Sequence, residues 1–250
     1  MTVHPEDHTL AADLAGAVGS LLVELRGRMV ADEAAHWDLK DAGDAAAHKL
    51  IMETLSTQRP DDAVLSEEGA DNVERLSAER IWIVDPLDGT REFAEPPRVD
   101  WAVHIALVVA GAPVAGAVAL PAENLVLGTG TAPVLPPAPG PVPRVIVSRT
   151  RRPPAAQELA RALDAEYIEM GSAGAKAMAV VRGDADIYAH SGGQYEWDSC
   201  APVAVAQAAG LHCSRIDGSP MTYNNADPYL PDLLICRPEW AERSLEILNS

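Results

Sequence analysis

Residues 80–93, with the sequence RIWIVDPLDGTREF, constrain the fold more than any other segment of this chain. The apolar, β-branched run at 81–84 predicts a buried strand, since turn residues follow it. This strand leads directly into two carboxylates, Asp85 and Asp88, with Pro86 between them. Proline fixes its own φ and donates no N–H, so it stiffens the turn. The segment therefore predicts a buried strand that ends in a rigid acidic turn.

The residues that follow favour a combined site for a divalent cation and a phosphate group. Gly89 permits a positive φ or a close backbone approach, and Thr90 supplies a hydroxyl where a short helix can begin. Magnesium prefers carboxylate, carbonyl and water oxygens and is often bound jointly with substrate phosphates, while N–H groups at a helix start attract phosphate. The alternative is an acidic turn that only solvates a loop, because Asp, Pro and Gly are common turn residues.

The segment resembles the signature of the inositol monophosphatase superfamily, which is a hydrophobic strand followed by Asp-Pro-(Ile/Leu)-Asp-Gly-Thr. The next residues, Arg91-Glu92-Phe93, resemble the (Lys/Arg)-Glu-Phe of the CysQ branch, the 3′-phosphoadenosine 5′-phosphate phosphatases. Inositol monophosphatases proper more often have Thr-Asn-Phe at this place. The resemblance covers essentially the whole chain and implies an α+β or α/β fold, a layered α-β-α-β-α sandwich with two lobes.

The resemblance also implies a function. Enzymes of this branch are Mg²⁺-dependent, lithium-sensitive phosphomonoesterases, so we expect hydrolysis of adenosine 3′,5′-bisphosphate to AMP and phosphate, with 3′-phosphoadenosine 5′-phosphosulfate as a further candidate substrate. Two alternatives stay open: an inositol-1-phosphate or fructose-1,6-bisphosphate phosphatase of the same superfamily, and a non-catalytic metal-binding protein. A haloacid-dehalogenase-type phosphatase is disfavoured, because its Asp-x-Asp spacing differs from the Asp-x-x-Asp of residues 85–88.

Composition limits the partners. Acidic residues outnumber basic ones by 37 to 19, which gives a net charge of −18. This balance argues against binding of a nucleic-acid polymer, which requires a basic surface. A phosphate substrate fits so acidic a chain only if metal cations supply positive charge, and the resemblance implies two or three Mg²⁺ ions. The partner is therefore expected to be a small phosphorylated molecule, and a homodimer is one option among oligomeric states.

The cysteines and the N-terminal segment favour a soluble cytoplasmic protein. Cys200, Cys213 and Cys236 are few, odd in number and without zinc-site spacing, which indicates reduced thiols. The segment 1–9 lacks the basic start and apolar core of a signal peptide. Since no apolar run approaches the length of a membrane span, we expect no membrane association.

The first half combines helices and an antiparallel meander. Helical spacing of leucine and valine predicts one helix at 9–28. The segment 44–55 is predicted as a second helix, with Asp44 as its N-cap. Alternation and turn residues predict strands at 63–66, 101–107, 114–120 and 125–127. His104, a lone histidine in an apolar strand, is expected to be a structural residue.

Two acidic positions of this half gain a second interpretation from the resemblance. The pair Glu67-Glu68 would ordinarily be solvated, but Ser66-Glu67-Glu68 resembles the (Gly/Ser)-Glu-Glu of the superfamily. Glu67 would then bind metal and orient the attacking water. Asp44 would help to hold a weaker third metal, although the usual Thr-x-x-Asp pattern lacks its Thr here.

Residues 131–143 contain six prolines, a composition that cannot join a sheet interior. We place the boundary between an N-terminal lobe at 1–130 and a C-terminal lobe at 144–250 in this stiff connection. The second lobe alternates strands and helices in a βα pattern. The predicted strands are 144–148, 167–169, 185–189, 211–214 and 233–236, and the predicted helices are 154–163, 173–181 and 198–209.

Two segments of the second lobe are predicted to carry chemistry. Gly171-Ser172-Ala173-Gly174-Ala175-Lys176 is a helix start rich in small residues, which either allows close packing or exposes N–H groups and a lysine to a ligand. It resembles the Gly-Ser-(Ala/Ser) segment of the superfamily. The segment 197–202 resembles the second signature, Trp-Asp-x-x-(Ala/Gly)-(Pro/Ala), in which the aspartate, here Asp198, binds metal.

The resemblance assigns the site as follows. A first Mg²⁺ is bound by Glu67, Asp85 and the carbonyl of Leu87, and a second by Asp85, Asp88 and Asp198. Glu67 and Thr90 position the water for in-line attack, while metal neutralises the phosphate charge and lowers the pKa of water. The expected substrate contacts are Asp88, Gly89, Thr90, Arg91, Gly171, Ser172, Lys176, Glu196 and Asp198.

Overall fold

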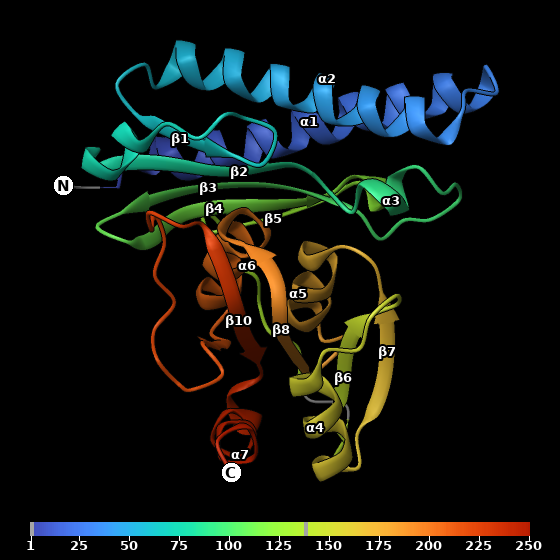
Figure 1. Cartoon of the computed structure of the whole chain (residues 1–250), viewed down its shortest axis with the longest axis vertical. Helices are drawn as coiled ribbons and strands as arrows, with labels where there is room; N and C mark the ends of the chain where they lie inside the picture. Colours follow the sequence, from blue (N-terminus) through green and yellow to red (C-terminus); the bar gives the residue numbers. More distant parts are fainter. Residues whose placement is uncertain (1–2, 138–139) are drawn as a thin grey trace.

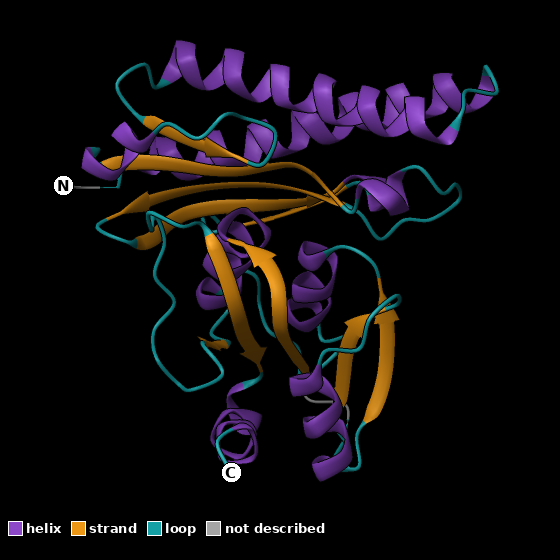
Figure 2. Ribbon diagram, in the orientation of Figure 1, coloured by secondary structure: helices purple, strands orange, loops and turns teal. Residues whose placement is uncertain are grey.

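The structure, a computed structural model, describes residues 3–137 and 140–250 as a stack of five layers (Figure 1). Residues 1–2 of the predicted first lobe and 138–139 of the predicted connection lie outside the described residues. Helices α1 and α2 cover one sheet, α5 and α6 separate it from a second sheet, and α4 and α7 cover the far face (Figure 2). The predicted α-β-α-β-α sandwich is thus confirmed. The helices are α1 (Pro5–Ala31), α2 (His36–Gln58), α3 (Thr90–Phe93), α4 (Pro154–Leu163), α5 (Ala173–Arg182), α6 (Glu196–Ala208) and α7 (Pro238–Leu248).

The first sheet has the strand order β1-β2-β3-β4-β5. Strands β1 and β2 are parallel, and every later neighbour pair is antiparallel, so the predicted meander is confirmed. Strand β2 extends to Asp88, beyond the predicted apolar run, and so carries both aspartates of the acidic turn. The strands are β1 (Ala63–Ser66), β2 (Arg80–Asp88), β3 (Ala102–Val109), β4 (Ala112–Leu120) and β5 (Leu125–Gly128).

The second sheet has the order β7-β6-β8-β10-β9 and is mixed. Strands β6, β7 and β8 are parallel, but β10 pairs antiparallel with both β8 and β9. The predicted succession of strands and helices agrees with the structure up to β10, but helix α7 was not predicted. The strands are β6 (Arg144–Ser148), β7 (Glu166–Met170), β8 (Ile187–Tyr195), β9 (His212–Ser214) and β10 (Tyr229–Cys236).

Three apolar clusters fill the spaces between the layers, and strand β3 takes part in two of them. Its side chains alternate between the two faces of the sheet. Val103, Ile105 and Leu107 pack toward α1 and α2, while Ala102, Ala106 and Val108 pack toward α5 and α6. The same alternation places His104 on the inner face, against the starts of the two central helices.

The predicted start of the second helix is wrong. Helix α2 begins at His36 with Ala35 as its N-cap, so Asp44 lies inside the helix and caps nothing. Gly43, directly before Asp44, is an interior packing position of this helix. A Cβ there would lie 2.8 Å from side-chain atoms of both Leu87 and Phe93. The close approach of α2 to the acidic turn therefore depends on this glycine.

Helix α1 is long and apolar enough, by length and composition alone, to cross a membrane, which differs from the expectation that no run approaches that length. Residues such as Leu14 and Val18 are buried, and the helix packs against β3, β4 and β5. Core helices of globular proteins pass the same test, so the finding is weak evidence for a membrane.

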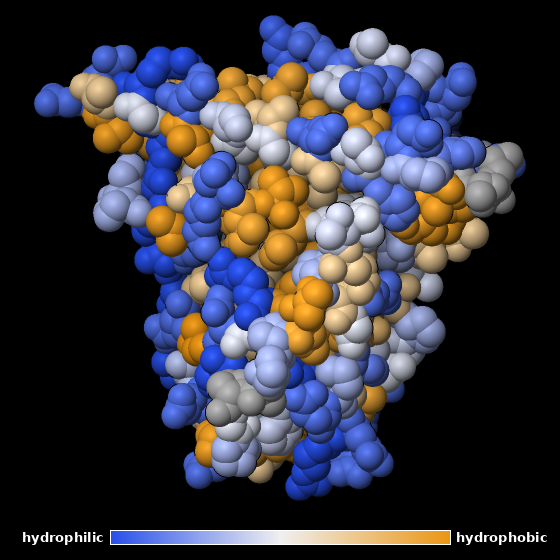
Figure 3. Space-filling view, turned by 180° about the vertical axis from the view of Figure 1, so that it is seen from behind, coloured by the Kyte–Doolittle hydropathy of each residue, from blue (hydrophilic) through white to orange (hydrophobic). Residues whose placement is uncertain are grey.

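Viewed from behind, the surface gathers apolar side chains in its middle, between hydrophilic regions (Figure 3).

Candidate active site

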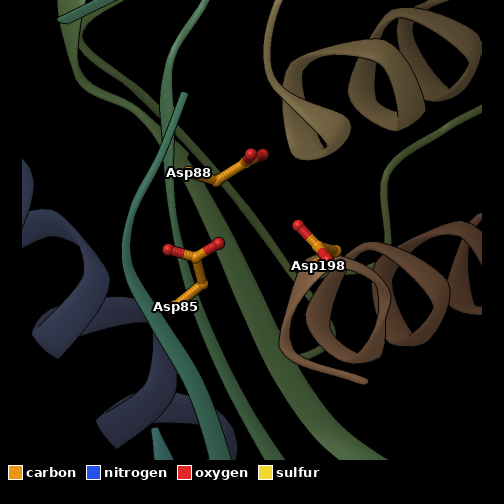
Figure 4. A group of neighbouring side chains, drawn as sticks. All are labelled: Asp85, Asp88 and Asp198. Carbon is orange, nitrogen blue, oxygen red and sulfur yellow. The ribbon is translucent and has the colours of Figure 1, made fainter. Parts of the chain in front are cut away.

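Three carboxylates converge where β2 ends and α6 begins. Asp85 and Asp88 come from β2, Asp198 comes from α6, and one ligand oxygen of each lies within 4.8 Å of the others. The three side chains point toward a common space between the strand and the helices (Figure 4). Asp85 and Asp88 are buried. The two separate sequence signatures are thus brought together in space.

An irregularity in β2 aims the two aspartates. Asp85 pairs with His104 of β3 and Asp88 pairs with Ala102, so the register shifts between them. Shifts of this kind bend a strand and redirect its side chains. The N–H of Leu87 donates to Asp85 Oδ1 at 3.0 Å, which leaves Oδ2 for another partner.

Gly89 ends the acidic turn in the left-handed region, with φ 86°. A Cβ at this position would meet Ser172 at 3.0 Å and the carbonyl of Asp100 at 3.3 Å, so both the conformation and the space favour glycine. Thr90 then begins α3, and its hydroxyl lies 3.1 Å from the carbonyl of Leu87 and 3.4 Å from Asp44 Oδ1. Asp44 is therefore a neighbour of the acidic turn.

Asp88 is surrounded by donors from the protein itself. Its Oδ2 accepts from the N–H of Gly174 at 2.6 Å and from the hydroxyl of Ser172, and it lies 3.2 Å from His104 Nε2. Burial alone would raise the pKa of Asp88, but the neighbouring His104, followed by Lys176, outweighs burial and lowers this pKa to about 2. This carboxylate is therefore ionised and held in place.

The other acidic groups lack neighbours that fully offset the effect of burial, so their pKa values are raised. Burial, followed by repulsion from Glu67 and Asp88, raises the pKa of Asp85 well above its usual value. Burial and then the charge of Asp88 raise the pKa of Asp198 to about 7. Glu67 is more exposed as a residue, yet desolvation by surrounding atoms and repulsion from Asp88 raise the pKa of its carboxyl to about 7.

These residues fit a hard divalent cation. Carboxylate oxygens are the ligands that Mg²⁺ prefers, and the close, mutually repelling carboxylates need a positive partner. Asp44 shows the same need, since burial and then Glu68 raise its pKa to about 7. The Leu87 carbonyl already accepts from Thr90 and retains its second lone pair.

A cavity of about 470 Å³ opens beside the carboxylates. Larger hollows of about 880 Å³ beside β5 and about 770 Å³ beside α1 contain none of the predicted site residues. The smaller cavity is chemically distinct, because three basic side chains line it together with two of the carboxylates. These lining residues are Asp88, Asp198, Arg91, Arg151 and Lys176.

The sequence from residue 6 to residue 249 matches the model of the inositol monophosphatase family. The chain belongs to this family. The match includes every residue of the candidate site, so the two signatures and the layered fold have one origin.

Curated relatives within the family carry more specific names. The chain is 51% identical over 232 residues to a 3′-phosphoadenosine 5′-phosphate phosphatase of Mycobacterium bovis, which covers 89% of this chain and 86% of the relative. It is 33% identical over 200 residues to the 3′(2′),5′-bisphosphate nucleotidase CysQ of Escherichia coli K12, covering 76% of this chain and 81% of the relative. Among solved structures, CysQ from Bacteroides thetaiotaomicron superimposes with a TM-score of 0.78 at 26% identity, covering 93% of this chain and 97% of that one.

Two residues predicted to contact substrate have hydrogen-bond partners within the protein. The ammonium of Lys176 is buried and donates to the carbonyls of Gly171 and Ser172, the latter at 2.7 Å, and burial lowers its pKa to about 8. The carboxylate of Glu196 accepts from the backbone N–H groups of Asn224 and Asn225 at 2.7 and 2.8 Å. Glu196 is absent from the cavity lining among the described residues, so we assign it no substrate contact.

Sequence reasoning missed other residues of this family site. Arg151 lines the cavity, where its guanidinium donates to the carbonyl of Gly192 and lies 3.1 Å from His190 Nε2. His104, expected to be structural, contacts Asp88 directly. Strand alternation could have placed His104 on the inner face, but its pairing with Asp85 depends on a register that the sequence does not reveal.

Proposed function

We propose that this protein removes the 3′-phosphate of adenosine 3′,5′-bisphosphate in a Mg²⁺-dependent hydrolysis that yields AMP and phosphate. The observation that carries the proposal is a single cavity lined both by two of the converging carboxylates, Asp88 and Asp198, and by basic side chains. A bisphosphate requires both, because one phosphate reacts while the other is recognised. The names of the relatives support the same substrate.

The carboxylate end would hold the metal through Asp85, Asp88, Asp198 and Glu67, with Leu87 and Asp44 as further candidates; two or three ions remain the expectation. When bound, Mg²⁺ would neutralise phosphate charge and make water more acidic. Asp88 contributes one oxygen, since its Oδ2 is already bound by the protein.

Thr90 and Glu67 are the proposed positioning groups for the attacking water. The Thr90 hydroxyl is oriented by the Leu87 carbonyl and Asp44, and the raised pKa of Glu67 lets this carboxyl accept a proton near neutral pH. The N–H groups of Gly89 and Thr90 start α3 beside the cavity and are proposed to contact the phosphoryl oxygens.

Arg91 and Arg151 are the proposed partners of the second phosphate. Both are exposed, both line the cavity, and an arginine can bind a phosphate through two hydrogen bonds. Gly171 and Ser172 also line the cavity, and Lys176 donates to the carbonyls of both. Lys176 thereby contributes positive charge without a direct substrate contact.

A substrate panel tests the proposal. Phosphate release is measured with Mg²⁺ from adenosine 3′,5′-bisphosphate, 3′-phosphoadenosine 5′-phosphosulfate, inositol 1-phosphate and fructose 1,6-bisphosphate. The highest kcat/KM is expected for the adenosine bisphosphate, and exhaustive EDTA treatment should abolish all activity until Mg²⁺ is restored. Faster hydrolysis of inositol 1-phosphate would refute the substrate, and full activity in EDTA would refute the metal. A cytoplasmic location and a homodimer stay predictions of the sequence.

A further inference from the structure

His104 is a fully buried histidine that connects the acidic turn with α6. Its Nδ1 lies 3.0 Å from the carbonyl oxygen of Trp197, the residue that precedes Asp198. A carbonyl only accepts hydrogen bonds, so Nδ1 carries a hydrogen and donates it. On its other side the ring brings Nε2 to 3.2 Å from Asp88 Oδ2. The side chain thus connects the two elements that carry the converging aspartates, β2 and α6.

The start of α5 is shaped to admit this ring. A Cβ on Gly174 would lie 2.0 Å from His104 Nε2, a distance that no real pair of atoms tolerates. The N–H of Gly174 and the ring both approach the same oxygen, Asp88 Oδ2. Among the described residues Nε2 makes no well-formed hydrogen bond, so its polar contact is the close approach to Asp88 Oδ2 at 3.2 Å.

The position of the ring also explains how Asp88 is oriented. With Oδ2 enclosed by the Ser172 hydroxyl, the Gly174 N–H and the imidazole, the carboxylate cannot rotate freely. Its other oxygen is left to face the space shared with Asp85 and Asp198. Partners of this kind, one shell outside a metal, fix ligand orientation and raise metal affinity.

We propose that His104 is a positioning residue for the metal site, one that fixes Asp88 through Nε2 and the start of α6, with Asp198, through Nδ1. The inference rests on the proposed function, since it assumes that these aspartates hold Mg²⁺ for the reaction. It adds that His104, which binds neither metal nor substrate, sets the orientation of these aspartates.

Three substitutions separate the two contacts. In His104→Asn the amide nitrogen is three bonds from Cα, as Nδ1 is, so a contact with the Trp197 carbonyl can be kept. In His104→Gln it is four bonds away, as Nε2 is, so a contact with Asp88 can be kept. His104→Leu keeps an apolar side chain of similar reach and removes both contacts. His212→Gln, on β9 of the second sheet, is the matched control.

The readouts are Mg²⁺ affinity by titration calorimetry without substrate, kcat and KM for adenosine 3′,5′-bisphosphate, and thermal unfolding. We expect His104→Leu to weaken Mg²⁺ binding and lower kcat by about 10- to 100-fold, with a smaller change in KM. His104→Gln should recover more Mg²⁺ affinity than His104→Asn, because Asp88 itself holds metal. The control should match the wild type.

The outcomes distinguish this inference from the proposed function. A folded His104→Leu protein with unchanged Mg²⁺ affinity overturns the inference. If that variant fails to fold, equal or reversed Mg²⁺ affinities of the Gln and Asn variants overturn it instead. Absence of nucleotide hydrolysis by the wild-type protein would refute the substrate, while the calorimetric comparison would still decide the role of His104.

Discussion

Two groups of side chains in the site, its carboxylate end (Asp85, Asp88 and Asp198) and its basic end (Arg91 and Arg151), are built in opposite ways. At the carboxylate end, Asp85 and Asp88 are buried, and Asp88 is held by donors from β3 and the start of α5. At the basic end, Arg91 and Arg151 are exposed, and Arg151 is held by contacts with a carbonyl and a histidine ring beside it. The first group is mostly buried, and the second is exposed to solvent.

This difference indicates a division of labour. Stabilising a transition state requires groups fixed before the reaction, whereas recognition of a remote phosphate needs charge and tolerates some freedom. Changes at the carboxylate end should therefore lower kcat for every substrate. Changes at the basic end should alter the preference among substrates.

The largest expected effect comes from Asp85→Asn and Asp198→Asn. Loss of a partner one shell outside a metal costs about 10–100-fold in affinity or activity, so loss of a ligand should cost more, at least a hundredfold in kcat. In EDTA, each variant should unfold at a temperature equal to or above that of the wild type, because a repelled carboxylate has been removed. Asp217→Asn, at an exposed turn, is the control. Turnover close to wild type in either variant would contradict the assignment.

The next effect concerns the basic end. Arg151→Ala should reduce kcat/KM for adenosine 3′,5′-bisphosphate by roughly ten- to a hundredfold, since a hydrogen bond to a charged group contributes about 1.5–3 kcal/mol. Inositol 1-phosphate, which has no second phosphate, should be affected much less. Arg152→Ala removes an exposed arginine that pairs with Glu169 and serves as the control. Equal losses with both substrates would show that the two ends are not divided in this way.

The sequence predicted the carboxylates of the site but not Arg151, and the reason is physical. The carboxylates lie in short segments whose order alone is diagnostic, such as Asp85–Thr90 and Trp197-Asp198. Arg151 follows a strand with no motif, and only the folding of β6 beside β8 brings it to the cavity. Lys176 was expected at the second phosphate, and its burial against the carbonyls of its own helix start was not visible in the sequence.

The fold, too, could be predicted where nearby residues determine the structure. Local patterns predicted most strands and helices, since alternation and helical spacing depend on nearby residues. The boundaries of the lobes at 130 and 144 remain a prediction. The error at the start of the second helix arose where tertiary packing decides, because α2 continues through Gly43, which lies against Leu87 and Phe93.

A smaller effect is expected in the pH dependence of stability, which should come from the carboxylates and not from the arginines. Asp44, Glu67 and Asp198 have a pKa of about 7 when folded, above their ordinary values of 3.8 to 4.5. The folded state then binds more protons than the unfolded state, so stability falls as pH rises through 7. In EDTA, Tm should be higher at about pH 6.5 than at about pH 8, by about 2–4 °C for each kcal/mol. Saturating Mg²⁺ should remove this trend, and a Tm in EDTA that rises with pH would contradict the prediction.

The smallest effect is expected for Cys200→Ser, although Cys200 lies only two positions from Asp198. The thiol is fully buried in the central apolar cluster, and burial raises its pKa well above the ordinary value, so it stays protonated and is no nucleophile. The serine hydroxyl can bond to a carbonyl one turn earlier in α6, which limits the cost of burying it to about 1–3 kcal/mol. We therefore expect a lower Tm with kcat and Mg²⁺ affinity near those of the wild type. A folded variant that binds Mg²⁺ normally but has lost turnover would instead place the cysteine in the chemistry.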